Sequence, residues 1–173
     1  MNPSVMTYLD TYCERAGQAG ALAEPLNLFT NLCFIMAALL CARTVAASGI
    51  ARKTDLWLLV GALFSIGVGS GLWHLVPTRA TMLMDVIPIT LFINIYLISA
   101  LRRLFHLSWW KVLFFWAVYF VAGIVAQKTL PPDLLNGTIM YIPTYLALVV
   151  MTLALLVRDR ASGKAFLEVV IVW

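Results

Sequence analysis

The sequence predicts an all-α fold, a polytopic transmembrane helical bundle that forms a single integral membrane domain over residues 1–173. Of its 173 residues, 62% are apolar and 12% are charged, whereas a soluble domain has about 45–50% and about 25%. The mean hydropathy is +0.93. The apolar residues form runs near the length of a bilayer-spanning helix, about 20 residues. These observations exclude a disordered chain, a disulfide scaffold and an ordinary cytosolic enzyme.

The elements follow in order along the chain. An outer acidic segment, residues 1–25, lacks the apolar core of a signal peptide. Five full spans come next, at about 26–47, 56–76, 81–101, 109–126 and 138–157. The start of a sixth span, residues 165–173, would cover about 13 Å of a hydrocarbon core about 30 Å thick. Because this run stops in mid-span, we expect the native chain to continue past Trp173.

The positions of the basic residues predict the orientation. Nine of the twelve Lys and Arg residues lie in the connectors after the first, third and fifth spans, and three lie on the other side. Positive charge collects on the cytoplasmic side of membrane proteins, so the N-terminus is expected to be extracytoplasmic. The charges flank the spans and do not form one basic surface, which excludes nucleic acid as a partner and leaves the lipid bilayer.

Ser70, His74 and Asp85 are the main group of polar residues at membrane depth, where such residues are costly. Ser70 and His74 are four residues apart and share one face of the second predicted span. The chain then reverses, so Asp85 in the third span returns to a similar depth near the outer surface. An intramembrane carboxylate costs about 2.5–3.5 kcal/mol on insertion scales. Singly, Ser70 fits a packing role and His74 an interfacial role, but together the three predict a functional site.

The outer segment carries a second polar cluster. Asp10, Glu14 and Glu24 are three carboxylates within fifteen residues, and Tyr12 lies among them. Oxygen ligands of this kind suit calcium. The spacing is not that of an EF-hand, so a solvated acidic face remains the alternative.

The stretches that hold these residues resemble the alkaline ceramidases, and in particular their bacterial members. This family belongs to a superfamily that includes the progestin and adipoQ receptors. The matching stretches are Asp10-Thr-Tyr-Cys-Glu14 with Glu24-Pro-Leu-Asn27, then Gly69-Ser-Gly-Leu-Trp-His74, and then Met84-Asp-Val-Ile-Pro88. The resemblance covers nearly the whole chain.

The resemblance implies a seven-helix zinc enzyme that hydrolyses the amide of ceramide-like lipids, releasing a fatty acid and a sphingoid base. Three histidines hold the zinc in such enzymes, and His74 matches the first. The other two form a His-x-x-x-His motif, which this chain lacks, so the chain as given is expected to be inactive and to bind zinc poorly. Asp85 would be the general base or would orient His74, and Ser70 would stabilise the oxyanion.

The resemblance also implies a calcium site in its eukaryotic members. Asp10, Glu14 and Glu24 match its acidic ligands, and Tyr12 would offer its main-chain carbonyl. Ala16 stands where some eukaryotic members have an asparagine. The likeness to bacterial members further implies the bacterial inner membrane as the location.

Two other functions stay open at this point. One is a non-enzymatic lipid receptor on the same scaffold, although that branch resembles the opposite topology. The other is a small proton-coupled transporter that uses Asp85 as a relay; no second buried acid pairs with it in the sequence. The sequence does not predict the oligomeric state.

Overall fold

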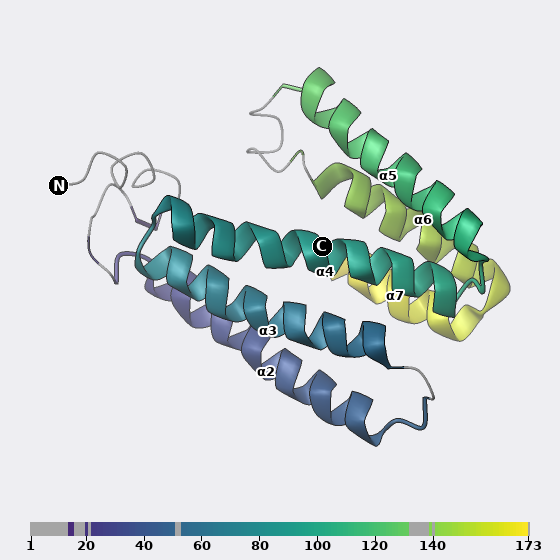
Figure 1. Ribbon diagram of the computed structural model, residues 1–173, viewed down its shortest axis with the longest axis horizontal. Helices are drawn as coiled ribbons and strands as arrows, with labels where there is room; N and C mark the ends of the chain where they lie inside the picture. Colours follow the sequence, from purple (N-terminus) through teal and green to yellow (C-terminus); the bar gives the residue numbers. More distant parts are fainter. Residues whose placement is uncertain are drawn as a thin grey trace. The chain divides into compact units, whose positions relative to one another are not determined.

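The computed structural model describes residues 14–15, 20, 22–50, 53–131, 139 and 141–172. The regular elements within these residues are α-helices, and no strand occurs among them, which confirms the predicted all-α class (Figure 1). The helices are α2 (Pro25–Ala47), α3 (Thr54–Leu75), α4 (Arg79–Arg103), α5 (Trp109–Thr129), α6 (Ile142–Arg158) and α7 (Arg160–Val172).

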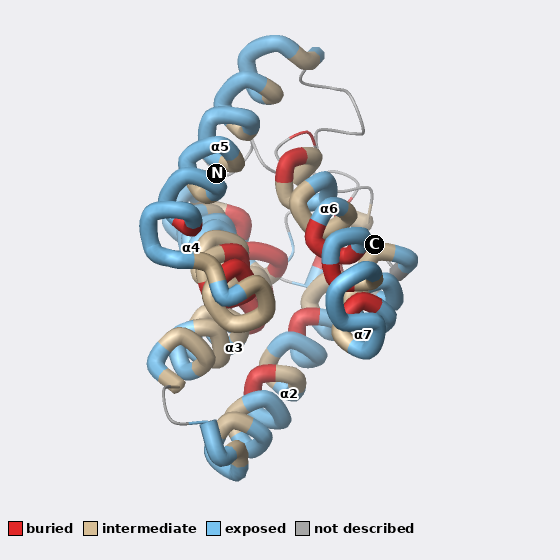
Figure 2. The backbone as a smooth tube through the Cα atoms, turned by 90° about the vertical axis from the view of Figure 1, so that its right-hand side faces the viewer, coloured by how far each residue is buried: buried red, intermediate tan, exposed pale blue. Residues whose placement is uncertain are grey.

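In the part of the chain that the structure describes, four helices are long and apolar enough to cross a membrane, namely α2, α3, α4 and α5. The helix α6 is shorter, with 17 residues. Much of their apolar surface is exposed (Figure 2); Trp110, for example, is 83% exposed. Water-soluble proteins do not leave such extensive apolar surfaces bare, whereas lipid covers them. The chain is therefore an integral membrane protein, and the count of five full spans stays a prediction.

The first four predicted spans coincide with α2 to α5, with ends that differ by at most three residues. Pro25 stands at the start of α2, where its fixed φ angle suits a helix and its missing N–H costs nothing. The helix α4 passes through Pro88 without a break and ends at Arg103.

The last two helices differ from the expected boundaries. The helix α6 begins at Ile142, and α7 begins at Arg160, where the sequence analysis expected a span from about residue 165. Asp159 alone separates them, because its carboxylate caps α7: Oδ1 accepts from the N–H of Ala161 at 3.2 Å, and Oδ2 accepts from Oγ of Ser162 at 2.5 Å. The hydrogen bond from the Ser162 side chain also lowers the pKa of Asp159.

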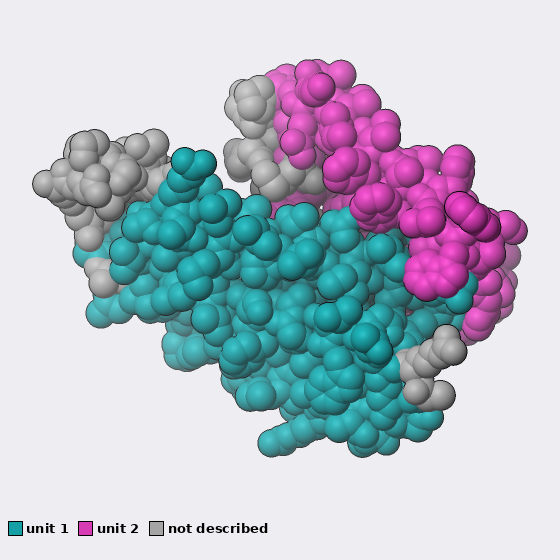
Figure 3. All heavy atoms as spheres, viewed as in Figure 1, with its two compact units in different colours: residues 1–103 teal, residues 104–173 magenta. Residues whose placement is uncertain are grey.

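The chain consists of two compact units, residues 1–103 and residues 104–173 (Figure 3). In the first unit, α3 packs against both α2 and α4. In the second unit, α6 packs against α5 and α7. Two compact units can belong to one membrane domain, so the single integral membrane domain stays a prediction. The residues of the candidate site that the structure describes all belong to the first unit.

Two glycines let α3 approach its neighbours on opposite sides. A Cβ atom added at Gly67 would lie 2.6 Å from Cγ1 of Ile35 on α2. A Cβ atom added at Gly69 would lie 1.9 Å from the main-chain oxygen of Met84 on α4. A side chain at Gly69 would push α3 and α4 apart, and a side chain at Gly67 would force Ile35 to move. The two glycines therefore set the spacing of α2, α3 and α4.

Candidate functional site

The structure brings Ser70, His74 and Asp85 together at one end of the α3–α4 pair. Ser70 and His74 lie in the last part of α3, and Asp85 lies near the start of α4. The Ser70 side chain and the His74 ring both lie within electrostatic reach of the Asp85 carboxylate. His74 is buried. The arrangement predicted from the spacing is thus present, while the roles of the three residues remain predictions.

The turn between the two helices is held by a reciprocal pair of threonines. The N–H of Thr78 donates to Oγ1 of Thr81 at 2.9 Å, and the N–H of Thr81 donates to Oγ1 of Thr78 at 3.2 Å. This is the capping-box pattern, which satisfies N–H groups left open at a helix N-terminus. It fixes where α4 begins, and therefore how far Asp85 lies from the end of α3.

One carboxylate oxygen of Asp85 is unsatisfied. Its Oδ1 is buried and has no hydrogen-bond partner among the residues that the structure describes. A buried polar atom without a partner costs about 1–3 kcal/mol, and more when it is charged. Folded proteins keep such atoms mainly where a ligand, a metal or a reacting group is needed. This oxygen is therefore a candidate contact point for a ligand or a reacting group.

The main chain beside Asp85 is also unusual. Pro88 has no N–H, so the carbonyl of Met84 lacks its usual helical donor four residues later. The same carbonyl faces Gly69, where only a glycine fits. This contact brings the main chain of Met84 and Asp85 close to α3, next to Ser70.

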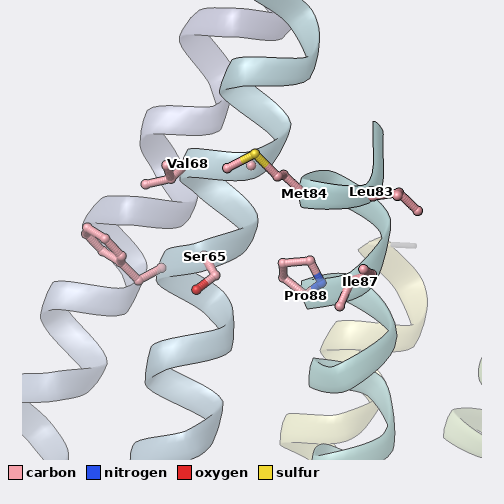
Figure 4. A pocket seen from close by; sticks show the side chains of 8 residues that line it. Ser65, Val68, Leu83, Met84, Ile87 and Pro88 are labelled. Carbon is pink, nitrogen blue, oxygen red and sulfur yellow. The ribbon is translucent and has the colours of Figure 1, made fainter. Parts of the chain in front are cut away.

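An apolar cavity of about 360 Å³ adjoins this contact (Figure 4). Figure 4 shows Met84 and Pro88 extending from α4 toward α3. The lining is apolar apart from the hydroxyl of Ser65, and includes Phe64, Val68 and Gly69 from α3. Small-molecule sites in proteins are cavities of this type, mostly apolar with a few polar groups. An apolar chain could therefore lie beside the polar cluster.

His74 pairs with Glu24, a residue that the sequence analysis had placed in a calcium site. Nδ1 of His74 lies 2.5 Å from Oε2 of Glu24. Glu24 is 2% exposed and precedes the first residue of α2. Carboxylates commonly hold metal-binding histidines in this way and fix the orientation of the ring. A metal bound by His74 would be coordinated through Nε2, on the other side of the ring.

Glu24 is ionised in these surroundings. Burial opposes its charge most strongly, but hydrogen bonds from Arg15, His74 and Asn27 together outweigh burial. The pKa of Glu24 therefore falls below its ordinary value of 4.5. The carboxylate has a steady negative charge next to His74.

Arg15 is the residue of this cluster that the sequence analysis missed, because it was counted only as a charge on the outer side. Its side chain is 0% exposed. Nε donates to Oε1 of Glu24, and Nη2 donates to the main-chain oxygen of His74 at 2.7 Å. One feature of the sequence could have indicated this role. Arg15 lies next to Glu14, on the predicted outer side of the membrane, where basic residues are few.

The predicted calcium ligands do not form a cation site in the described part of the chain. Asp10 and Tyr12 lie outside the described residues. Both oxygens of Glu14 accept main-chain N–H groups of α2, from Leu26 at 2.7 Å and from Asn27 at 3.1 Å. The oxygens of Glu24 are occupied as described above. Glu14 and Glu24 are thus both engaged within the protein, and the calcium site, which also needs Asp10 and Tyr12, stays a prediction.

The residues that would hold zinc fit in part. His74 offers an imidazole as one ligand, and Asp85, which is not counted as a ligand, lies within electrostatic reach of it. Catalytic zinc takes three protein ligands and one open position. Among the described residues, no group of three His, Cys, Asp or Glu side chains could hold a metal ion. The other histidine of the sequence, His106, belongs to the second unit.

Comparisons of the chain with models of known protein families, with curated proteins and with solved structures found no match.

Proposed function

We propose that the protein is a zinc-dependent intramembrane amide hydrolase that acts on ceramide-like lipids and releases a fatty acid and a sphingoid base. The substrate class comes from the resemblance to the alkaline ceramidases. The observation that carries the proposal is the half-buried pair of Ser70 and Asp85 beside the buried His74, in which the buried Oδ1 of Asp85 has no partner among the described residues.

His74 would contribute one zinc ligand through Nε2, with Glu24 holding the ring from Nδ1. Two further protein ligands must come from outside the described residues, and the resemblance implies a His-x-x-x-His motif for them. When bound, zinc would polarise the amide carbonyl and activate the attacking water.

Asp85 would act as the general base of the reaction. Its Oδ1 would accept the proton of the attacking water and return it to the nitrogen of the leaving amine. The sequence analysis left open whether Asp85 instead orients His74. The contact between Glu24 and Nδ1 supports the role of base, because Glu24 already performs the orienting task.

Ser70 would have two tasks. In the resting site its side chain lies within electrostatic reach of Asp85 and would favour the ionised carboxylate. During the reaction its hydroxyl would donate to the oxygen of the amide carbonyl as negative charge develops there. The spacing of one helical turn between Ser70 and His74 suits a carbonyl held between them.

The cavity beside Gly69 supports a lipid substrate, because it is apolar and adjoins the cluster. An acyl chain in this cavity would leave its amide at the level of Ser70 and Asp85. We also propose that the N-terminus is extracytoplasmic and that the protein resides in the bacterial inner membrane, so that the cluster lies near the outer leaflet.

The test is a hydrolysis assay on the full-length native protein in lipid vesicles that contain ceramide. We expect release of free sphingoid base, loss of that release with a zinc chelator, and its return when zinc is added. A zinc-loaded protein that binds ceramide but hydrolyses no amide would support the receptor function and contradict the proposal.

A further inference from the structure

A buried guanidinium lies at the outer end of the first unit, among the carboxylates that the sequence assigned to calcium. Arg15 donates to Glu24 through Nε, to the main-chain oxygen of Gly20 at 3.3 Å through Nη1, and to the main-chain oxygen of His74 at 2.7 Å through Nη2. A charge that is fully removed from water needs such a set of partners.

The oxygens of the nearby carboxylates are already occupied. Calcium takes about six to eight oxygen ligands at about 2.3–2.6 Å. Glu14 uses both oxygens on the first N–H groups of α2. Glu24 uses one oxygen on Arg15 and the other on His74 and Asn27. A divalent cation would have to compete with these donors for the remaining lone pairs and lie beside a buried positive charge.

Arg15 also joins elements that are far apart in the sequence. The main-chain oxygen of His74 belongs to the last turn of α3, where carbonyl groups have no helical donor and where positive charge is favourable. The carboxylate of Glu24 lies at the start of α2 and reaches the ring of His74. One guanidinium thus contacts both the main chain of His74 and the carboxylate that holds its ring.

We propose that Arg15 is a built-in cation, which takes the place of a bound calcium ion and positions Glu24 and His74. The neighbouring residue Glu14 accepts hydrogen bonds from the N-terminus of α2. Glu14 and Arg15, which are consecutive in the sequence, therefore link the start of α2 to the end of α3. This proposal concerns the architecture of the outer end and does not depend on the reaction. Its failure and the failure of the hydrolase proposal are therefore distinguishable.

The experiment measures the melting temperature of the full-length protein in detergent, in EGTA and in about 1 mM calcium chloride, a concentration that fills weak extracellular sites. Four proteins are compared: wild type, Arg15→Met, Arg15→Lys and the control Arg79→Met. Methionine keeps the apolar stem of Arg15 without its charge, and lysine keeps the charge. Arg79 is an exposed arginine at the start of α4 in the same unit.

We expect the wild type to melt at the same temperature in calcium and in EGTA. Arg15→Met should melt about 6–20 °C lower, as expected for one lost partner of a buried ion pair. Arg15→Lys should recover part of this loss, and Arg79→Met should match the wild type.

Two results would overturn the proposal. The first is a wild type that calcium stabilises by several degrees, since that would show a working calcium site. The second is an Arg15→Met protein as stable as Arg15→Lys, since that would make the charge irrelevant. If Arg15→Met does not fold, the calcium response of the wild type and the melting temperature of Arg15→Lys relative to wild type still decide the matter.

Discussion

Gly69 on α3 faces the main-chain carbonyl of Met84 on α4 so closely that a Cβ atom at Gly69 would lie 1.9 Å from that oxygen. Pro88 removes the helical donor that this carbonyl would otherwise have. Gly69 and Met84 therefore bring the main chains of α3 and α4 into close contact. Ser70 follows Gly69 in the sequence, and Asp85 follows Met84. The site depends on a glycine that takes no part in its chemistry.

Gly69→Ala should therefore be costly. We expect it to destabilise the protein by about 3 kcal/mol or more, at the upper end for overpacked positions, because the clash is with main chain and no rotamer change relieves it. The matched control is Gly61→Ala on the same helix, where nothing lies within 4 Å of the added atom. That change should be neutral or stabilising by up to about 1 kcal/mol. Thermal melts of both variants provide the measurement, and equal melting temperatures would contradict the contact.

A second polar cluster links α3 to α4 at the other end of this helix pair. Oδ1 of Asp55 accepts from Nη2 of Arg103 at 2.5 Å, and Oδ2 accepts from Nε of Arg103 at 2.7 Å and from the hydroxyl of Ser99. Arg103 and Asp55 are about a third exposed. We expect Asp55→Ala to cost about 1–2 kcal/mol, in the range of hydrogen bonds to charged groups at a partly wet site.

A double-mutant cycle with Arg103→Ala checks this cluster. The second substitution should cost little once Asp55 is absent, and the site residues at the far end of the helices should keep their function. Fully additive losses would show that the two side chains act independently.

The charge of Glu24 predicts how stability depends on pH. Its pKa is lowered in the folded protein, because the hydrogen bonds from Arg15, His74 and Asn27 outweigh burial. The stabilisation is then fully present above the ordinary value of 4.5 and is lost as the pH falls through the lowered folded value. Melting temperatures of wild type and Glu24→Gln over the range from about pH 6 to about pH 3 measure this effect. The difference between them should shrink toward the acid end, and a constant difference would argue against an ionised Glu24.

Hydrophobic patterning predicted α2 to α5 closely, because long apolar runs between charged connectors leave few alternatives. It placed the end of α6 within one residue, but it put the start of the next span at residue 165, whereas α7 begins at Arg160 after a one-residue connector at Asp159. The basic residues after α6 also predict a cytoplasmic segment, and the first of them within α7 is Arg160. A local capping interaction of this kind does not change the average hydropathy.

The candidate site was likewise predictable from the sequence only in part. The helical spacing of Ser70 and His74 and the reversal before Asp85 were sufficient to predict that the three meet. The pairing of Glu24 with His74 spans 50 residues, and the contact of Arg15 with the main chain of His74 spans 59. Such distant contacts follow from the packing of α2 on α3, which no periodicity in one segment reveals.

The role of Ser70 gives a graded prediction. Ser70→Ala should keep the metal and lose at most about 2.7–4 kcal/mol of transition-state stabilisation, the range for one oxyanion donor. The measurement is kcat on a ceramide substrate together with zinc content. A loss of zinc would show that Ser70 shapes the metal site instead.

The central claim is that Asp85 is a general base beside a zinc ion held by His74. The most direct test measures zinc content and amide hydrolysis together on purified full-length Asp85→Asn and His74→Ala. We predict that Asp85→Asn keeps most of its zinc while turnover falls at least about 100-fold, and that His74→Ala loses zinc and activity together. Asp85→Asn protein that loses zinc as completely as His74→Ala, or that keeps wild-type turnover, would contradict this account.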